Sequence, residues 1–374
     1  MARFMKLKSL AVLIIFCSSA WAFNANAQVA SDVTLTPDGN ILKKIEKTYN
    51  VKAGGNLTVA SEFGAIDIQT AEQEKVEAAI IFSPAGSGVV NIVGNNVVNN
   101  NVVIQSNSNR GNVVIINGKV QNGSKFKLDP RVKEAVEDFE VTFEHKGSDV
   151  RIDGKFKKGR KHWRKELRQL TILFQVTVPQ QYNIDLDTSN GSISVADLDG
   201  DVRAKTSAGS LRLGRIKGPV WGRTSAGSVK LTSCDSTVDV KTSSGSIEIG
   251  DVAGDVQAQT SSGSIKLESL AGTVNARTSS GSIRASLTDQ PKRECNLRTS
   301  AGSITVTLIP DIAINLDAET SAGRVSTQFP VTSVIHGKVP KNRLKGSING
   351  GGPLLKLRTS AGSIRLQKAE KAAN

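Results

Sequence analysis

Residues 202–213 read Val-Arg-Ala-Lys-Thr-Ser-Ala-Gly-Ser-Leu-Arg-Leu, and the pattern returns 18 residues later as Val-Trp-Gly-Arg-Thr-Ser-Ala-Gly-Ser-Val-Lys-Leu over residues 220–231. The unit Thr-Ser-x-Gly occurs nine times, beginning at Thr188, Thr206, Thr224, Thr242, Thr260, Thr278, Thr299, Thr320 and Thr359. The first six threonines are 18 residues apart, and steps of 21, 21 and 39 follow. A fixed period near 20 residues is typical of a solenoid, in which each repeat buries its apolar side only against its neighbours.

Apolar residues occupy four places in the repeat: four and two residues before the threonine, and five and seven after it. In the repeat of Thr260 these are Val256, Ala258, Ile265 and Leu267. Apolar residues two apart with polar residues between them indicate strands, so each repeat predicts two short strands. The sequence therefore predicts an all-β fold, a single parallel β-solenoid (β-helix) of roughly 18-residue coils, with an inserted segment that contains a short helix.

The Ser-x-Gly corner turns the chain between the two strands. Its glycines suit a backbone with positive φ, where a Cβ would clash; they include Gly209, Gly227, Gly245, Gly263 and Gly281. The repeat threonine falls on the inward parity, so we expect a structural column of hydroxyl groups that hydrogen-bond along the stack. A catalytic serine in the motif is the disfavoured alternative, because none of the first eight motifs contains a histidine to act as base.

Two cysteines test this assignment of inward positions in the repeat. Cys234 and Cys295 stand where other repeats carry core aliphatic residues, in two different columns. About three coils separate them, or roughly 14 Å at the spacing of paired strands. A disulfide requires Cα atoms within about 7 Å, so we expect two buried free thiols.

The N-terminus has the features of an export signal. Arg3, Lys6 and Lys8 precede an apolar run that ends at Phe16, and a small-x-small site ends at Ala27. We expect residues 1–27 to be a cleaved signal peptide and the protein to be exported to the periplasm, the outer surface or the medium. The apolar run is too short to span a bilayer.

The remaining chain divides into four further parts. Residues 28–82 hold N-terminal strands and a first degenerate coil at 57–68, and residues 83–180 form an insertion. Within the insertion an Asn/Val/Gly-rich stretch precedes a helix, which is expected to begin after Asp129-Pro130, and then strands and a basic run. Residues 181–367 form the regular solenoid with a C-terminal cap, and residues 368–374 form a polar tail.

The chain resembles the bacterial "putative adhesin" domain family of β-solenoid proteins. The similarity is carried by Ile-Leu-Phe-Gln-Val-Thr-Val-Pro at 172–179, by Ile-Asp-Leu-Asp-Thr-Ser-Asn-Gly-Ser-Ile at 184–193, and by the closing stretch at 345–364, which looks like that family's terminal coil. It covers roughly residues 51–366, with an interruption at about 83–130. The resemblance implies a β-solenoid fold and carries no catalytic residues.

Outward places in the repeat are rich in positive charge, in keeping with a formal net charge of +14. One stripe lies immediately before the threonine and a second lies six residues after it; together they contain Lys205, Arg223, Lys241, Arg277, Arg298, Arg212, Lys230, Lys266 and Arg284. Like charges stacked at about 4.8 Å repel one another, so the stripes are either a solvated face or a site for a polyanion. The stripes lack aromatic residues, which disfavours nucleic acid as the ligand.

A denser basic run surrounds His162 and Trp163. It is a solvated loop or a contact for anionic headgroups, and its central members are Lys157, Lys158, Arg160, Lys161, Arg164 and Lys165. The segment Asp-Leu-Asp-Gly-Asp at 197–201 lacks the ligand spacing of a helix-loop-helix calcium site, so turn aspartates explain it better. The sequence indicates no metal site and no cofactor.

Three classes of function fit a β-solenoid. An enzyme acting on polysaccharide needs acids and bases on a few adjacent coils, whereas Asp239, Glu248 and Asp255 are dispersed among bases. A self-assembling fibre subunit needs flat exposed ends, and the first and last coils look atypical. We therefore expect a non-catalytic, adhesin-like binding or structural protein of the envelope or surface, whose partner is an anionic polysaccharide, lipopolysaccharide or another envelope component.

Overall fold

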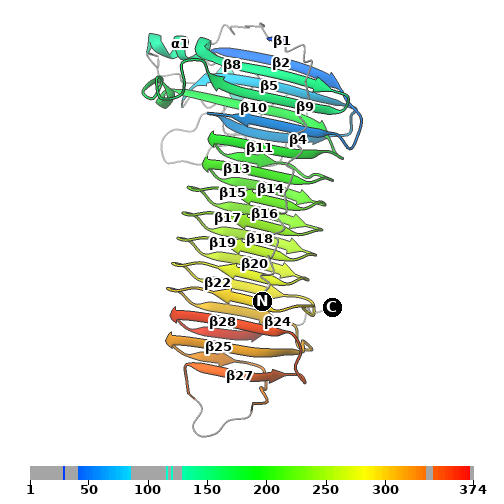
Figure 1. Ribbon diagram of the computed structural model, residues 1–374, viewed down its shortest axis with the longest axis vertical. Helices are drawn as coiled ribbons and strands as arrows, with labels where there is room; N and C mark the ends of the chain where they lie inside the picture. Colours follow the sequence, from blue (N-terminus) through cyan, green and yellow to red (C-terminus); the bar gives the residue numbers. More distant parts are fainter. Residues whose placement is uncertain are drawn as a thin grey trace, which may run out of the picture.

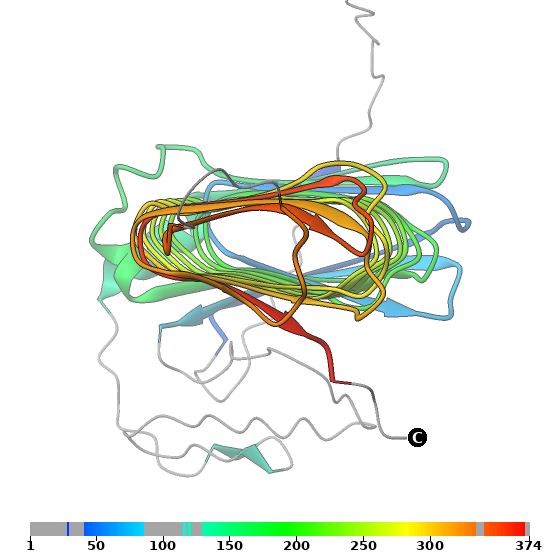
Figure 2. The ribbon, with the colours of Figure 1, turned by 90° about the horizontal axis from the view of Figure 1, so that it is seen from below.

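The protein is a long flattened rod made of two facing β-sheets (Figure 1). The computed structural model describes residues 41–85, 129–333 and 340–370, together with the backbones of residues 28–29, 115–116 and 119–120. Seen along its axis, the chain winds in superimposed flat coils, with one sheet on each long side (Figure 2). The solenoid predicted from the repeat is confirmed, whereas the predicted signal peptide lies outside the described residues.

Sheet A has 14 strands. In spatial order they are β1 (Gln28–Val29), β8 (Phe139–Lys146), β9 (Asp149–Phe156), β3 (Asn56–Ser61), β11 (Asn183–Asn190), β13 (Val202–Ala208), β15 (Val220–Arg223), β17 (Val238–Lys241), β19 (Val256–Gln259), β21 (Val274–Arg277), β23 (Cys295–Arg298), β28 (Leu354–Ala361), β25 (Ile314–Ala322) and β27 (Arg343–Ile348).

Sheet B has 13 strands. In spatial order they are β2 (Lys43–Asn50), β5 (Lys75–Pro84), β10 (Leu170–Pro179), β4 (Ala65–Ala71), β12 (Ile193–Val195), β14 (Leu211–Ile216), β16 (Val229–Cys234), β18 (Ile247–Val252), β20 (Ile265–Leu270), β22 (Ile283–Leu287), β24 (Ile304–Leu308), β29 (Ile364–Lys368) and β26 (Val325–Thr327). A separate antiparallel pair joins β6 (Ile115–Ile116) to β7 (Lys119–Val120).

Stacking in register places each apolar column inside the rod. Val238 pairs with Val256 in sheet A, and Ile247 pairs with Ile265 in sheet B, so equivalent residues of successive coils stack on one another. The four predicted inward columns are buried in every coil of the regular array. In the coil of β25 and β26, at the end of the stack, Val325 occupies the column five residues after the threonine and is only partly buried. Cys295 occupies the column four residues before the threonine, and Cys234 occupies a further inward column ten residues after it, beside Ile216 and Val252; both are buried free thiols.

The repeat threonines are buried and hold each coil to the next. The Thr260 hydroxyl donates a hydrogen bond of 2.9 Å to the carbonyl of Gly245, and Thr242 makes the same bond to Gly227 at 2.8 Å. The hydroxyl column therefore does bond along the stack, but each threonine reaches the corner glycine of the neighbouring coil rather than the next threonine.

Close approach between coils, more than backbone conformation, requires glycine at the corner. A Cβ on Gly245 would lie 2.1 Å from the carbonyl oxygen of Gly227, a distance that no real Cβ contact allows. Gly263 and Gly281 have φ of 152° and 149°, as expected. Gly209, Gly227 and Gly245 lie outside the left-handed range of φ. Backbone conformation therefore does not require glycine at these three corners, and contact with the preceding corner is the common reason for glycine.

Both ends of the stack contain a coil from a distant part of the sequence. The degenerate coil formed by β3 and β4 lies between the coil of β9 and β10 and the coil of β11 and β12. At the other end β28 and β29, the last strands of the chain, lie between β23 and β24 on one side and β25 and β26 on the other. Antiparallel strands complete the stack at its two ends, including β27 beside β25.

The expected helix is present as α1 (Pro130–Asp138). The Asp129 side chain caps it by accepting a hydrogen bond from the backbone N–H of Arg131, and Val132, Ala135 and Val136 are buried. The strands expected after this helix are present as β8, β9 and β10. Apart from the β6–β7 pair, the Asn/Val/Gly-rich stretch at 86–123 lies outside the described residues. Across the described part of the chain, no helix is long and apolar enough to cross a membrane.

A candidate ligand groove on the outer face of sheet A

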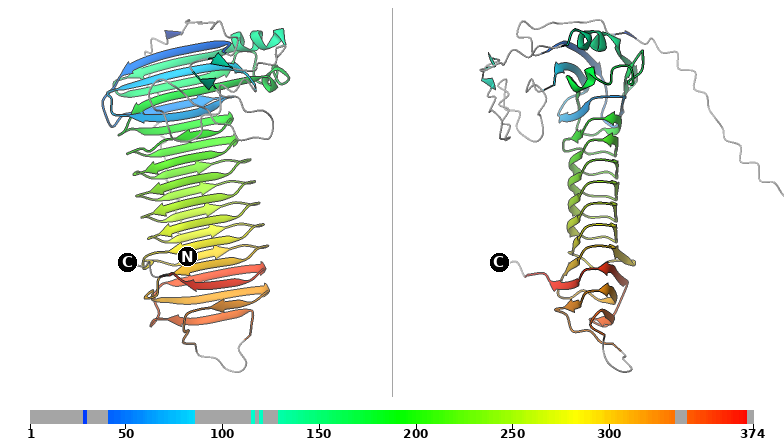
Figure 3. Two further views of the ribbon diagram at one scale, coloured as in Figure 1. Left: turned by 180° about the vertical axis from the view of Figure 1, so that it is seen from behind. Right: turned by 90° about the vertical axis from the view of Figure 1, so that its left-hand side faces the viewer.

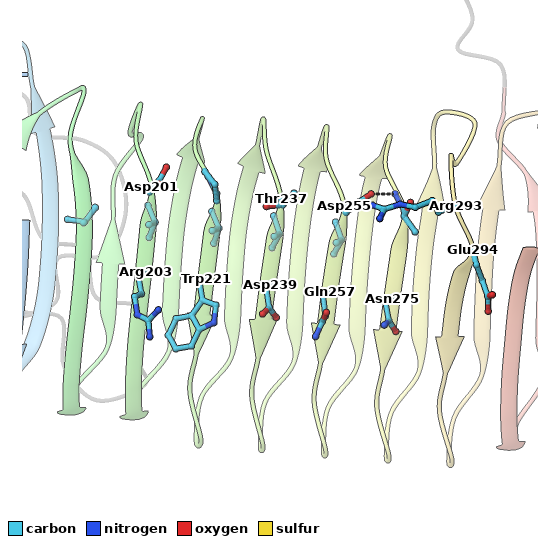
Figure 4. Close-up of a pocket in the computed structure, with 17 residues that line it drawn as sticks. Asp201, Arg203, Trp221, Thr237, Asp239, Asp255, Gln257, Asn275, Arg293 and Glu294 are labelled. Atoms are coloured by element: carbon cyan, nitrogen blue, oxygen red, sulfur yellow. Dashed lines mark hydrogen bonds and ion pairs between the residues drawn. The ribbon is translucent and has the colours of Figure 1, made fainter. Parts of the chain in front are cut away.

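The outer face of sheet A carries a groove of about 680 Å³ that runs across successive coils. Two rows of side chains line it, one from the middle of the strands and one from the residues that lead into them (Figure 4). The first row consists of the residues three places before each repeat threonine: Arg203, Trp221, Asp239, Gln257 and Asn275. Because the coils stack in register, one residue from each of five coils contributes to this row.

Trp221 is the aromatic residue of the groove and is held between two guanidinium groups. The carbon at the centre of the Arg203 guanidinium lies 4.1 Å from a ring centroid of Trp221, and that of Arg223 lies 4.5 Å away. Arg223 is fixed in turn by a 2.5 Å bond to the carboxylate of Asp239 and a 2.8 Å bond to its carbonyl. The indole is therefore oriented by cation–π contacts while remaining partly exposed.

The second row consists of the residues five places before each repeat threonine: Asp201, Pro219, Thr237, Asp255 and Thr273. An ion pair between two coils closes the end of this row. Asp255 accepts a 2.9 Å hydrogen bond from the backbone N–H of Thr273 and forms an ion pair with Arg293. The backbone N–H of Thr273, together with Arg293, lowers the pKa of Asp255. Arg293 can reach across because the repeat from Thr278 to Thr299 is three residues longer than the preceding 18-residue steps. The longer repeat thus supplies an end wall for the groove.

A smaller hollow of about 260 Å³ continues the groove towards the C-terminal end of the array. Gln257, Gln259, Asn275 and Asn296 offer amide groups, and Arg277 and Arg298 offer guanidinium groups. Neither arginine forms an ion pair within the described residues. This continuation therefore presents hydrogen-bond donors and acceptors next to two uncompensated positive charges.

The structure divides the nine predicted stripe residues between opposite faces. Those before the threonine lie on sheet A, where Lys205 pairs with Asp187 at 3.0 Å and Arg223 pairs with Asp239. Lys241, like Arg277 and Arg298, has no ion pair in the part of the chain that the structure describes.

On sheet B the second stripe is partly neutralised. Glu248 lies 3.7 Å from the ammonium of Lys230 and 3.8 Å from that of Lys266, and Lys266 also contacts Glu268. Arg212 and Arg284 are exposed and make no ion pair with a described residue. The nine residues therefore do not form one surface, and the sheet A members are the ones that border a groove.

Sequence reasoning about the stripes missed the row that contains Trp221. The stripe before the threonine repeats one charge, whereas the row three residues before it changes identity at every coil, from arginine to tryptophan, aspartate, glutamine and asparagine. The change of residue type at this outward position was the available signal of a binding surface. A face that only contacts solvent does not require a tryptophan there.

The basic run is a folded corner rather than a free loop. Its members Lys157, Lys158, Arg160, Lys161, Arg164 and Lys165 are exposed, and we call them the basic corner. Trp163, by contrast, is buried and donates a 2.6 Å hydrogen bond from Nε1 to the carboxylate of Asp138. In the segment at 197–201, Asp197 pairs with Arg215 at 2.6 Å and Asp199 with Lys217 at 2.7 Å, so these turn aspartates are used to join coils.

One family model and several solved structures match the chain. A family model described as Toastrack DUF4097 matches residues 99–367. A crystal structure of a putative cell adhesion protein from Clostridium sporogenes aligns at 14% identity over 87% of this chain and 100% of its own, with a TM-score of 0.21. A putative adhesin from Bacteroides fragilis aligns at 12% identity over 87% of this chain and 97% of its own, with a TM-score of 0.37. No curated protein matches the chain.

Proposed function

Since the chain belongs to the Toastrack DUF4097 family, whose members are β-solenoids, we propose that it is an exported, non-catalytic binding protein that holds a segment of acidic polysaccharide in the sheet A groove. The observation that carries this proposal is that the groove runs on from Trp221, fixed between Arg203 and Arg223, into the hollow bordered by Arg277 and Arg298, which form no ion pair with a described residue. Export rests on the features of residues 1–27.

Each part of the groove matches one part of a charged sugar chain. The apolar face of a sugar ring packs on the exposed surface of an indole such as Trp221, as other apolar groups do. Sugar hydroxyls hydrogen-bond with the amides of Gln257, Asn275 and Asn296. A carboxylate or sulfate pairs with arginine in a charge-assisted, bidentate contact, which Arg277 and Arg298 can each provide.

The ligand is expected to run along the rod, crossing the strands. Equivalent side chains of adjacent coils are about 4.8 Å apart, so an extended chain that runs along the groove meets one further side chain of the row at each coil. A small acidic sugar would engage only one end of the row, and we therefore expect affinity to rise with the length of the saccharide.

Two of the four acids that line the groove, Asp239 and Asp255, favour binding over hydrolysis. A glycosidase needs one carboxyl group with a raised pKa to act as general acid. Asp239 is engaged by Arg223, and Asp255 has a lowered pKa because of the Thr273 backbone N–H and Arg293. Both carboxylates therefore serve to position arginine side chains.

The test compares two double variants that remove the same charge from opposite faces. Arg277→Gln/Arg298→Gln should weaken binding of polygalacturonate about 5- to 30-fold, because exposed ion pairs contribute about 0.5–1 kcal/mol each. Arg212→Gln/Arg284→Gln on sheet B should bind as the parent protein does. Trp221→Ala should weaken binding about tenfold, the value of one aromatic stack.

Neutral dextran and lipopolysaccharide serve as comparison ligands in the same titration. The Arg277→Gln/Arg298→Gln variant should bind dextran as the parent protein does, because dextran carries no charge. If the acidic sugars of lipopolysaccharide are the ligand, its affinity should fall in the same variants as that of polygalacturonate. Equal loss of polygalacturonate binding in both double variants would refute the groove, because it would show that binding follows net charge alone.

A further inference from the structure

The basic corner is held rigidly by residues beneath it. The carboxylate of Asp138, at the end of α1, accepts hydrogen bonds from the Trp163 indole at 2.6 Å and from the backbone N–H of Lys158 at 3.1 Å. Glu166, in the 3-10 helix η1 (Glu166–Arg168), is buried and pairs with Arg131 of α1 at 2.9 Å. A turn anchored at both Trp163 and Glu166 presents its lysines and arginines in fixed positions.

The same contacts remove negative charge from the corner's surface. Glu166 is the one acid among residues 155–168, and it is turned inward with Asp138. None of the six exposed cations forms an ion pair with a described residue. Burial, and to a smaller extent the charge of Lys157, lowers the pKa of the neighbouring Lys43, whereas Glu137 acts in the opposite direction. Because Arg131 is engaged by Glu166, the exposed part of α1 carries Lys133 against Glu134 and Glu137, an excess of one negative charge beside the six cations of the corner.

The corner and α1 lie together at one end of the rod, opposite the end formed by β27 (Figures 1 and 3). The exposed cations of the basic corner therefore lie at one tip of an elongated molecule.

We propose that the basic corner docks this end of the rod on a bilayer surface that contains anionic phospholipids. The six exposed cations fall within the nine residues 157–165, a density of charge that suits an array of phosphates on a surface. Trp163, the aromatic residue that could stack on a sugar, is buried beneath the turn and bonded to Asp138. Docking through this tip leaves the sheet A groove, which lies along the side of the rod, free for its own ligand.

The experiment measures sedimentation of the protein, purified after export, with vesicles of phosphatidylcholine alone or of phosphatidylcholine with phosphatidylglycerol. The corner variant is Lys157→Gln/Lys158→Gln/Lys161→Gln/Lys165→Gln. A control variant removes four exposed lysines near the opposite end: Lys292→Gln/Lys341→Gln/Lys345→Gln/Lys368→Gln. Each lysine near an anionic surface contributes about a fivefold factor, so the corner variant should lose more than about 100-fold in vesicle affinity.

The parent and the control variant should bind the anionic vesicles alike, and neither should bind phosphatidylcholine alone. Binding should weaken as salt rises above about 0.1 M. A Lys→Arg version of the corner variant should bind like the parent, which separates loss of charge from loss of folding. Equal losses in the corner and control variants would overturn the proposal, as would binding of polygalacturonate that depends on the corner while anionic vesicles are ignored. Arg277→Gln/Arg298→Gln should bind vesicles normally, so failure of the groove and failure of the corner are distinguishable.

Discussion

Replacing Thr260 by valine tests the side-chain hydrogen bond that adds to the backbone ladders between one coil and the next. The Thr260 side chain is 2% exposed, and its hydroxyl donates to the Gly245 carbonyl at 2.9 Å. Valine has nearly the same shape but no hydroxyl group, so the corner carbonyl loses its side-chain donor inside the stack. An unsatisfied buried acceptor costs about 1–3 kcal/mol, compared with a net value of about 0.5–1.5 kcal/mol for an ordinary hydrogen bond. We therefore expect Thr260→Val to lower the free energy of unfolding by about 2 kcal/mol.

Two further variants isolate the hydroxyl group. Thr260→Ser keeps the donor and loses one methyl group, so it should cost only about 0.8 kcal/mol. Thr232→Val changes an exposed threonine on sheet B and should have an effect close to zero. Urea unfolding followed by circular dichroism gives the midpoints and slopes for all three. If valine proved as stable as threonine at 260, or serine less stable than valine, the threonine–glycine bond would not add to the backbone ladders between the coils.

Three other changes probe the core, the corner and the end wall. Ile265→Asp places a charge in a side chain that is 1% exposed and should unfold several coils, seen as a loss of strand signal in circular dichroism; a variant with the parent's spectrum and melting temperature would contradict the register. Gly245→Ala puts a Cβ 2.1 Å from the Gly227 carbonyl oxygen and should cost more than about 2 kcal/mol in urea unfolding, so a neutral result would argue against close-packed corners. The pKa of Asp255 is lowered in the folded state by the Thr273 N–H and Arg293, so its stabilisation is present above the unfolded pKa of about 3.9 and is lost as pH falls through the folded pKa. Asp255→Asn should therefore flatten the fall of melting temperature in that acid range, and an unchanged profile would show that this carboxylate contributes nothing.

The body of the rod was predictable because the alternation of apolar and polar residues that specifies each strand is local and recurs in every repeat. Apolar residues at positions such as Val256 and Ile265 have one possible side on which to be buried once the strand period is known. The order of coils at the ends was not predictable in this way. Leu316 of β25 and Leu355 of β28 occupy the same column, so either strand satisfies the pattern of the coil next to Cys295. The apolar columns specify how two stacked strands align, but they do not specify which strand stacks on β23.

The candidate groove illustrates a different limit. Alternation predicts correctly that Lys205, Arg277 and Arg298 point outward, since these side chains are exposed. It does not reveal which cations are neutralised, because the partners come from other coils: Lys205 is paired with Asp187, whereas Arg277 has no described ion pair. The contact of Trp221 with Arg203 likewise depends on stacking of two coils. The binding properties of a solenoid face depend on contacts between side chains of different repeats, and the pattern within one repeat does not reveal those contacts.

The exchange of coils near the C-terminal end has a consequence for the time course of folding. A chain is made from its N-terminus, so β25 and β26 exist before β28 and β29, which finally separate them from β23 and β24. In that interval the earlier strands can pair directly, because their columns are compatible, and such a pairing would block the slot for the final coil. The finished rod therefore depends on a step that must wait for the whole chain, in which late residues enter between partners already synthesised. Assembly that simply adds one coil after another would reach a different, kinetically accessible stack.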